Sequence, residues 1–581
     1  MTSILITDGQ ELAGLGAARS LGRAGYHVTV AIPQGLLAPV MSSRYVAQVV
    51  ESPNPWSDQP AFRQFLCEQA TKHSVLLPVS EASIVAAAAC RNQLGKTTLL
   101  APSDEALRFS LSKYHATRAA QSVGLSTPPT MFVAGEHWPS DLSSVMCELD
   151  ALGYPLLIKH DNYLTPSGKY VRGRTQRVSS PLQARALLVE LQEYGAQVIA
   201  QRPVDGHGAG VFLLRHNGQT LLRFAHERLH EVPYTGGVSS LRMSCHDDAL
   251  LARSEQLLSA IGFDGVAMVE FRKTPSGTPQ FLEINGRLWG SLALALHAQV
   301  DFPLLWLRSV LGQSVPSVRD YPDGLRCRNV LPGELSHLAS VLRSREVPLT
   351  GKLRSLWEQV ALSFDVSIRH DHLWYDDPRP ALTQASLWAH DVGRRLWGRV
   401  GRSKQMHADK EILSQEQRDT EARFSRLPRP VRRVLVLCLG NICRSPFAEH
   451  YLRRESKERG MSGLHVESAG FLHHDGLRTP TRFVELVRSH SVDLSGHRAR
   501  RVTAQQIDDA DMILLMDAQN LRALHSEFPH AVHKTFLIGL LSAHGPAEIP
   551  DPYMLSIGDA EASYQKLAEA CSATIRRLQA R

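Results

Sequence analysis

The sequence lacks several features that mark whole classes of protein. It has only 8 cysteines in 581 residues and no Cys-x-x-Cys pair, which argues against a disulfide scaffold and favours reduced thiols in a cytoplasmic protein. No apolar run approaches the ~18 residues that span a bilayer. The first residues, MTSILITDGQ, have no basic region typical of a signal peptide. We therefore expect no membrane insertion.

The charge distribution argues against another class. The chain has 64 Lys and Arg against 57 Asp and Glu, a formal net charge of +7, and its basic residues form no continuous run. This slight excess gives no case for nucleic acid as a partner. The content of 43% hydrophobic and 21% charged residues is that of an ordinary soluble protein.

The length and the pattern of the chain predict several α/β domains. A chain of 581 residues is about four times the ~150 residues usual for one domain. Strand and helix patterns alternate through the first half, and a polar stretch precedes a new apolar strand at Val434. The expected parts are a βαβ domain at 1–105, an α/β domain at 106–310, its extension at 311–400, a polar linker or solvated helix at 401–430 and a C-terminal domain at 431–581.

A strand, a loop and a helix follow one another in the C-terminal part. Residues 434–437 are apolar and lead into Cys438-Leu-Gly-Asn-Ile-Cys-Arg444-Ser-Pro, after which a helix begins. This order aims the loop N–H groups and the positive end of the helix dipole at one point. A cysteine in that field is expected to be a thiolate near neutral pH, and Arg444 offers a planar fork for two phosphate oxygens. The pattern predicts a phosphate loop with Cys438 as nucleophile; the alternative is a buried cysteine beside a surface arginine.

Residues 431–581 resemble the low-molecular-weight protein tyrosine phosphatases. The resemblance rests on CLGNICRS at 438–445, ESAG at 467–470, DLSGHRAR at 493–500, MILLMD at 512–517 and DPY at 551–553. It implies a doubly wound parallel α/β sheet, with Cys438 as nucleophile, Arg444 as the phosphoryl-binding residue and Asp551 as general acid. The residues implied to form and support the loop are Leu439, Gly440, Asn441, Ile442, Cys443, Ser445, Ser468 and His497.

The remaining cysteines leave one alternative open and argue against another. Cys443 is either the partner of a protective disulfide with Cys438, as the resemblance implies, or a small buried hydrophobe. The related arsenate reductases need two further downstream cysteines, whereas only Cys571 follows Cys443 here, so that activity is not expected. The expected substrate is a phosphomonoester or a phosphotyrosine protein.

Two strands of the first half carry acidic residues that should face each other. Residues 265–271 and 280–287 are interpreted as the arms of a hairpin centred on Ser276-Gly277, a register that places Glu270 opposite Glu283. Opposed carboxylates destabilise a strand pair unless a cation lies between them, and Asn285 adds an oxygen on the same face. Two carboxylates and an amide suit Mg²⁺ that bridges nucleotide phosphates. The alternative is a solvated polar edge.

These residues resemble the ATP-grasp superfamily over about residues 1–310, and they imply its preATP-grasp and ATP-grasp folds. By that resemblance Glu270, Glu283 and Asn285 hold Mg²⁺ or Mn²⁺. Arg287 is implied to steady the transferring phosphoryl group, residues 165–169 to cover the triphosphate, and Glu227, Arg228 and Gly236-Gly237 to line the acceptor side. The residues implied to bind ATP are Lys113, Lys159, Gln201 and Val204, the last two in a hinge that holds adenine through backbone groups.

The two halves together predict a bifunctional enzyme. The first would be an ATP- and Mg²⁺-dependent ligase that activates a small-molecule carboxylate as an acyl phosphate for attack by an amine. The second would hydrolyse a phosphomonoester through a cysteine phosphoenzyme. Two alternatives concern the first half: a weakly catalytic nucleotide- or metabolite-binding module that regulates the phosphatase, or an ATP-dependent kinase.

Overall fold

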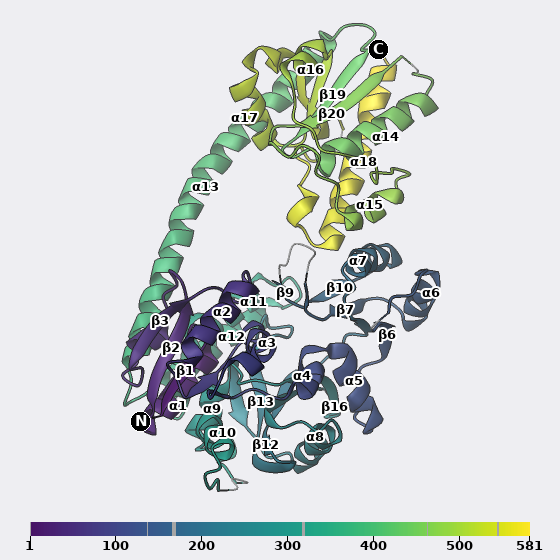
Figure 1. Cartoon of the computed structure of the whole chain (residues 1–581). Helices are drawn as coiled ribbons and strands as arrows, with labels where there is room; N and C mark the ends of the chain where they lie inside the picture. The colour runs from purple at the N-terminus through teal and green to yellow at the C-terminus, as the bar shows by residue number, and fades with distance from the viewer. Residues whose placement is uncertain (1, 136, 165–169, 317–319, 462, 543–544) are drawn as a thin grey trace. The chain divides into compact units, whose positions relative to one another are not determined.

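A computed structural model of the chain describes residues 2–135, 137–164, 170–316, 320–461, 463–542 and 545–581 (Figure 1). The chain divides into two compact units. The first comprises residues 1–138, 157–176 and 194–394, and the second comprises residues 139–156, 177–193 and 395–581. In the part of the chain that the structure describes, no helix combines the length and the apolar character of a membrane span.

The first unit begins with the expected βαβ arrangement. Five parallel strands lie in the order β3-β2-β1-β4-β5, and their apolar side chains, such as those of Ile4 and Leu5, are buried on both sides because helices cover the sheet. The elements are β1 (Ser3–Ile6), α1 (Leu12–Arg23), β2 (His27–Pro33), β3 (Gln48–Ser52), α2 (Gln59–Ala70), β4 (Val75–Leu77), α3 (Glu81–Ala89) and β5 (Thr98–Leu99).

Two further sheets carry the residues expected to bind ATP. A four-stranded sheet has the order β10-β7-β11-β6, and a seven-stranded sheet has the order β16-β15-β12-β13-β14-β17-β18. The strands are β6 (Thr130–Ala134), β7 (Leu156–His160), β10 (Thr175–Val178), β11 (Val198–Gln201), β12 (His207–His216), β13 (Gln219–Val232), β14 (Val238–Ser244), β15 (Gly265–Lys273), β16 (Pro279–Asn285), β17 (Arg326–Arg328) and β18 (Arg369–His370); β8 (Tyr163–Leu164) and β9 (Tyr170–Val171) form a separate pair.

The helices of this part of the chain flank those sheets in sequence order. They are α4 (Asp104–Leu111), α5 (Lys113–Ser122), α6 (Ser143–Leu152), α7 (Pro181–Glu193), α8 (Asp248–Ala260), α9 (Leu292–His297), α10 (Phe302–Val310), α11 (Leu335–Arg343) and α12 (Leu349–Phe364). Contacts place α6 and α7, which lie within the α/β domain expected at 106–310, in the second unit.

The β15–β16 hairpin differs from its expected register by one residue near the turn. Phe271 pairs with Phe281, so the turn is centred on Ser276 and not between Ser276 and Gly277. A bulge at Leu282 then shifts the pairing, and Glu270 does face Glu283 as expected. Because an extra residue on one strand reverses the facing of the residues beyond it, the phenylalanines lie in the core and the glutamates on the opposite face.

The second unit contains a four-stranded sheet that is parallel throughout, in the order β20-β19-β21-β22, as the doubly wound expectation requires. Its strands are β19 (Arg433–Cys438), β20 (His465–Gly470), β21 (Met512–Leu515) and β22 (Thr535–Leu537). Its helices include α14 (Arg444–Glu458), α15 (Thr481–Arg488), α16 (Ala504–Asp509), α17 (Ala518–Glu527) and α18 (Ile557–Gln579).

Residues 401–430, expected to be a solvated helix or linker, are helical for most of their length. They form the second half of α13 (Arg379–Ser425), a helix of 47 residues (Figure 1). Its last turns are not solvated on all sides: Phe424 is 6% exposed and its ring lies 5.9 Å from that of Phe536. Ile412 and Leu413 pack against the core of the second unit. Sparse apolar side chains thus anchor a helix whose composition is largely polar.

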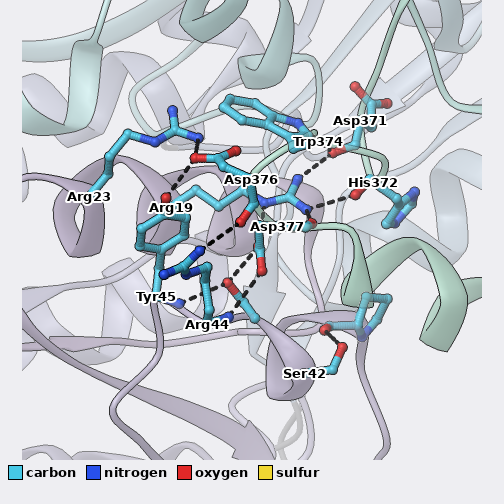
Figure 2. A network of polar contacts seen from close by, with 12 residues as sticks. Arg19, Arg23, Ser42, Arg44, Tyr45, Asp371, His372, Trp374, Asp376 and Asp377 are labelled. Atoms are coloured by element: carbon cyan, nitrogen blue, oxygen red, sulfur yellow. Dashed lines mark hydrogen bonds and ion pairs between the residues drawn. The ribbon is translucent and has the colours of Figure 1, made fainter.

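A buried arginine of α1 binds the segment that follows β18. Arg19 is 1% exposed, and its Nε donates to Asp377 Oδ2 at 2.9 Å (Figure 2). Its two other nitrogens donate to the backbone carbonyls of Asp371, His372 and Asp377 at 2.7 to 3.0 Å. Burying a guanidinium is costly unless its donors are satisfied, and here four hydrogen bonds satisfy it.

We expect Arg19→Ala to lower the free energy of unfolding of the first unit by about 3–5 kcal/mol, because Asp377 would stay buried without its cation. Arg23→Ala is the matched control. Arg23 pairs with Asp376 at 2.6 Å, but both side chains are more than a third exposed, so the loss should be about 0–1 kcal/mol. Urea unfolding followed by tryptophan fluorescence measures both; equal losses would contradict the role given to Arg19.

Candidate active sites

The loop after β19 brings Cys438 and the start of α14 together. Cys438 is the last residue of the strand, and Arg444 is the first residue of the helix. The thiol, 3% exposed, lies 3.0 Å from Ser445 Oγ and accepts a hydrogen bond from the Asn441 backbone N–H at 3.3 Å. Asn441 has a φ of 51°, in the left-handed region that asparagine tolerates better than most residues, and this conformation turns the loop back onto the sulfur.

Asn441 is the centre of the network that holds this loop. Its Nδ2 donates to Ser445 Oγ and to Ser468 Oγ, both at 2.9 Å, and its carbonyl lies 2.7 Å from His497 Nε2. Ser468 Oγ donates in turn to the buried Glu449 at 2.5 Å. The structure therefore brings together Asn441, Ser445, Ser468 and His497, and it adds Glu449, which sequence reasoning missed.

Arg444 is oriented by two aspartates and one carbonyl. Its Nη1 donates to Asp517 Oδ2 at 2.6 Å and to the Ile549 carbonyl at 2.9 Å, and its Nη2 donates to Asp551 Oδ2 at 2.8 Å. Asp551 is about half exposed, whereas Arg444 is buried. Asp517 was not among the expected site residues; the signal was its position just after a buried strand, where it also caps α17 through the Asn520 N–H.

The other loop residues line the turn around the thiol. Leu439, Gly440 and Ile442 lie between the two cysteines, and the Ile442 carbonyl accepts a hydrogen bond from Thr479 Oγ1 at 2.6 Å. Cys443 is buried and, like Cys438, is a free thiol. Burial raises the pKa of the Cys443 thiol, and the nearby carboxylate of Asp551 adds to that shift.

The acidic residues of the first unit lie together as expected. Asn285 Nδ2 donates to Glu270 Oε1 at 3.1 Å and to Glu283 Oε1 at 3.2 Å. Arg228 of β13 pairs with Glu270 Oε2 at 2.9 Å, and Lys113 of α5 pairs with Glu283 Oε2 at 3.5 Å. Each carboxylate is paired with a cation, and the side chains of Glu270 and Glu283 are 17% and 31% exposed, which argues against a fully solvated polar edge.

The charged groups of this cluster shift one another's pKa values. Burial raises the pKa of Glu270, and Arg228 offsets only part of that effect. Although burial acts to raise it, the pKa of Glu283 is lowered to about 2 by the nearby Lys113 and Lys159. Burial lowers the pKa of Lys159, a residue of β7, to about 8. The cluster therefore holds cations and an ionised carboxylate side by side.

A cavity of about 220 Å³ adjoins the cluster and is lined mostly by charged and polar side chains. Arg287 reaches it and lies 3.4 Å from Asn285 Oδ1 and 3.4 Å from Glu81 Oε1. Glu81 comes from the first turn of α3, in the N-terminal sheet domain, and also accepts from Asn162 Nδ2 at 3.3 Å. Sequence reasoning did not single out Glu81, because nothing local marks a helix-start glutamate as part of a site about 200 residues away.

The residues expected to hold adenine have other partners. Gln201 is buried on β11, where its Nε2 donates to Thr130 Oγ1 at 2.9 Å, while its Oε1 has no partner among the described residues. The Val204 carbonyl accepts one hydrogen bond from Arg272 Nε at 3.0 Å, which leaves its second lone pair for another donor. Residues 165–169, expected to cover the triphosphate, lie outside the described residues.

Of the four residues expected on the acceptor side, Arg228 alone contacts the acidic cluster among the described contacts. Glu227 pairs with Lys273 Nζ at 2.7 Å. Gly236 and Gly237 lie beside the Arg272 guanidinium and the Val232 carbonyl. Arg228 thus neutralises Glu270.

The donor set of the cluster fits a hard divalent cation. In the described part of the chain no three His, Cys, Asp or Glu side chains group to hold a metal ion; the candidate set is two carboxylates and one amide. Carboxylate and amide oxygens are the ligands that Mg²⁺ prefers. Asn285 turns its nitrogen toward both glutamates, so ligation through Oδ1 requires a half-turn of the amide.

Comparisons with known families agree with the two sites. The model described as "Low molecular weight phosphotyrosine protein phosphatase" matches residues 433–581. The model described as "ATP-grasp in the biosynthetic pathway with Ter operon" matches residues 210–331, so the chain also carries an ATP-grasp domain. That match includes the acidic cluster but not Lys113 and Lys159.

Known relatives cover the C-terminal part. The probable low molecular weight protein-tyrosine-phosphatase EpsP of Ralstonia solanacearum is 33% identical over 151 residues, which is 26% of this chain and 99% of that protein. YfkJ of Bacillus subtilis is 34% identical over 150 residues, 25% of this chain and 95% of that protein.

Solved structures resemble about half of the chain at low identity. The N5-carboxyaminoimidazole synthetase of Staphylococcus aureus has a TM-score of 0.41 and 18% identity, covering 54% of this chain and 78% of that one.

The two phosphatases EpsP and YfkJ are each more than 30% identical to this chain, and the match spans almost their whole length. Through residues 433–581 the chain therefore belongs to the low molecular weight phosphotyrosine protein phosphatase family.

Proposed function

We propose that the protein is bifunctional, combining a cysteine-dependent phosphatase of the phosphotyrosine type with an ATP-dependent carboxylate–amine ligase of the ATP-grasp type. The observation that carries the first activity is the convergence of Cys438, Arg444 and Asp551 at the end of β19. The observation that carries the second is the Glu270–Asn285–Glu283 cluster with its surrounding cations, inside a matched ATP-grasp domain.

The phosphatase reaction needs three groups in sequence. The Cys438 thiolate attacks phosphorus, while Asp551 protonates the leaving oxygen; the same residue, now a carboxylate, then activates water to hydrolyse the phosphocysteine. Ser445 and the Asn441 N–H stabilise the sulfur as an anion, since both lie within hydrogen-bond distance of it. Arg444 binds two phosphoryl oxygens, and its contact with Asp517 keeps the guanidinium in the required plane.

The ligase reaction is assigned to the cavity of the first unit. Lys113 and Lys159 would bind nucleotide phosphates, and Arg287 would stabilise charge on the transferring group. A bound divalent ion, Mg²⁺ or Mn²⁺, would neutralise phosphate charge, held by Glu270, Glu283 and Asn285. The acceptor would be a small-molecule carboxylate, activated as an acyl phosphate for attack by an amine. Adenine would be recognised through backbone groups of residues 201–204, where the Val204 carbonyl accepts one hydrogen bond and keeps a second lone pair.

One observation favours the alternative that the first unit is a regulatory nucleotide-binding module. The Arg228–Glu270 ion pair competes with the contact that a nucleotide's metal ion would make with Glu270. Incubation of the protein with Mg²⁺-ATP and a library of carboxylates and amines, scored by release of ADP and phosphate, separates ligase from binding module. ATP binding without turnover in any mixture would favour the regulatory module, and phosphorylated product without an amine would favour a kinase.

We expect Cys438→Ser to abolish hydrolysis of para-nitrophenyl phosphate while phosphate still binds, because the loop N–H groups and Arg444 remain. Phosphate binding is measured by calorimetry on the full chain. Cys147→Ser, at an exposed cysteine of α6, is the matched control and should keep full activity. Wild-type hydrolysis by Cys438→Ser would refute the assignment of the nucleophile.

We expect Asp551→Asn to slow hydrolysis by about 10²–10⁴-fold for phosphate esters of poorly acidic alcohols, since an amide donates no proton to the leaving oxygen. Esters of acidic phenols need little protonation and should be affected much less. The measurement is kcat/KM plotted against leaving-group pKa, with the exposed Asp508→Asn as control. An equal loss for all esters would show that Asp551 is not the general acid.

We expect Glu283→Gln to reduce ATP turnover at least ~100-fold, because the substitution removes one of two charged oxygens opposed across the hairpin. Phosphatase activity should be unchanged, which controls for folding of the second unit. Glu255→Gln, at a glutamate of α8 that pairs with Arg223, is the isosteric control in the first unit. Equal Mg²⁺-ATP turnover in Glu283→Gln and in the wild type would contradict the metal assignment.

A further inference from the structure

Helix α12 exposes its apolar side chains and turns its small and polar side chains inward, the reverse of an ordinary surface helix. Trp357 is 74% exposed and Phe364 is 81% exposed, although both are large and apolar. The inward positions carry Gly351, Ser355 and Gln359, and only Leu362 is a buried hydrophobe. A helix of a monomeric protein normally buries its apolar stripe and exposes its polar side.

The exposed apolar side chains of α12 form one continuous stripe. At about 100° of rotation per residue, six of them fall within an arc of about 100°. We call this set the α12 stripe; its members are Leu349, Leu353, Leu356, Trp357, Val360 and Phe364. A stripe of this width is what a helix buries against one neighbouring helix.

The size of the α12 stripe exceeds that of a typical surface patch. Its exposed area is roughly 700 Å², with each fully exposed aromatic residue counted at about 150–250 Å². The largest apolar patch of a monomer is about 300–600 Å². One partner of a standard interface contributes about 800 Å². The stripe alone thus supplies most of one side of a stable interface.

The spacing of the α12 stripe is symmetric along the helix. Its midpoint lies between Leu356 and Trp357, and the intervals on the two sides are the same. In an antiparallel pair of identical helices, Leu353 therefore lies opposite Val360, and Leu349 lies opposite Phe364. A surface that complements itself after a two-fold rotation is what an isologous dimer requires.

Few charges lie along α12. It carries two cations, Lys352 and Arg354, and one anion, Glu358, which pairs with His230 of the same chain at 3.4 Å. The two cations and one anion on the helix give little attraction to anionic lipid, so a membrane surface fits less well.

We infer that the α12 stripe is a dimer interface, in which α12 of one copy packs antiparallel against α12 of a second copy. The full-length protein is then a two-fold symmetric dimer with two copies of each catalytic unit. The two helices cross next to Trp357, whose indole is buried against the partner in the dimer.

Sedimentation velocity of the full-length protein across a range of concentrations tests the dimer. The wild type should sediment as a dimer, and Leu353→Glu should shift its dissociation constant upward at least ~100-fold, because it places a charge in the centre of the stripe. Leu382→Glu, at a residue 71% exposed on α13 and outside the stripe, is the matched control and should stay dimeric. A monomeric wild type at all concentrations would overturn the inference, as would dissociation by both variants.

Oxidative cross-linking tests the antiparallel register. Two copies of residue 356 lie about 1.5 Å apart along the helix axis in the antiparallel pair, whereas two copies of residue 349 lie about 22 Å apart. Leu356→Cys should therefore form a disulfide-linked dimer, and Leu349→Cys should give no more than the wild-type background from native cysteines. Efficient cross-linking of both would indicate a parallel pair and overturn the register. A Trp357 emission shift that requires anionic vesicles, with a monomeric protein, would indicate a membrane surface and overturn the dimer.

Discussion

A single unpaired residue, Leu282, sets the geometry of the acidic site in the first unit. Without the bulge, a hairpin centred on Ser276 would place Leu282 opposite Glu270 and turn Glu283 to the other face. With it, Phe271 and Phe281 stay in the core while both glutamates share one face. This register is what places both carboxylates within reach of Arg228 and Lys113.

The two candidate sites use the same physical arrangement in different folds. Each places carboxylates and cations from distant segments at the end of a strand, where burial strengthens their interaction. In the phosphatase unit, Arg444 is held between Asp517 and Asp551; in the ATP-grasp unit, Arg228 and Lys113 hold Glu270 and Glu283. A charge that is kept ionised and fixed in direction needs no reorganisation when a phosphate binds, which is the basis of electrostatic catalysis.

Two buried arginines connect the segment after β18 to the rest of the first unit. Arg19 binds Asp377, and Arg242 binds Asp371, which Figure 2 shows beside the same turn. The same part of the chain carries α12, whose apolar stripe has no cover within the described residues of the first unit. The extension thus has one face fixed by buried ion pairs and another that is available to a second copy.

The sequence by itself determined the chemistry of the phosphatase loop, because strand, loop and helix are consecutive there and the spacing from Cys438 to Arg444 fixes their local geometry. It also predicted that Glu270 faces Glu283, but the bulge at Leu282 that produces this pairing appeared only in the structure. The tertiary structure alone decided the contacts of Glu81 with Arg287 and of Arg19 with Asp377, which join residues 206 and 358 positions apart. It also decided which side of α12 is buried, because periodicity gives the apolar face of a helix but not the direction in which that face points.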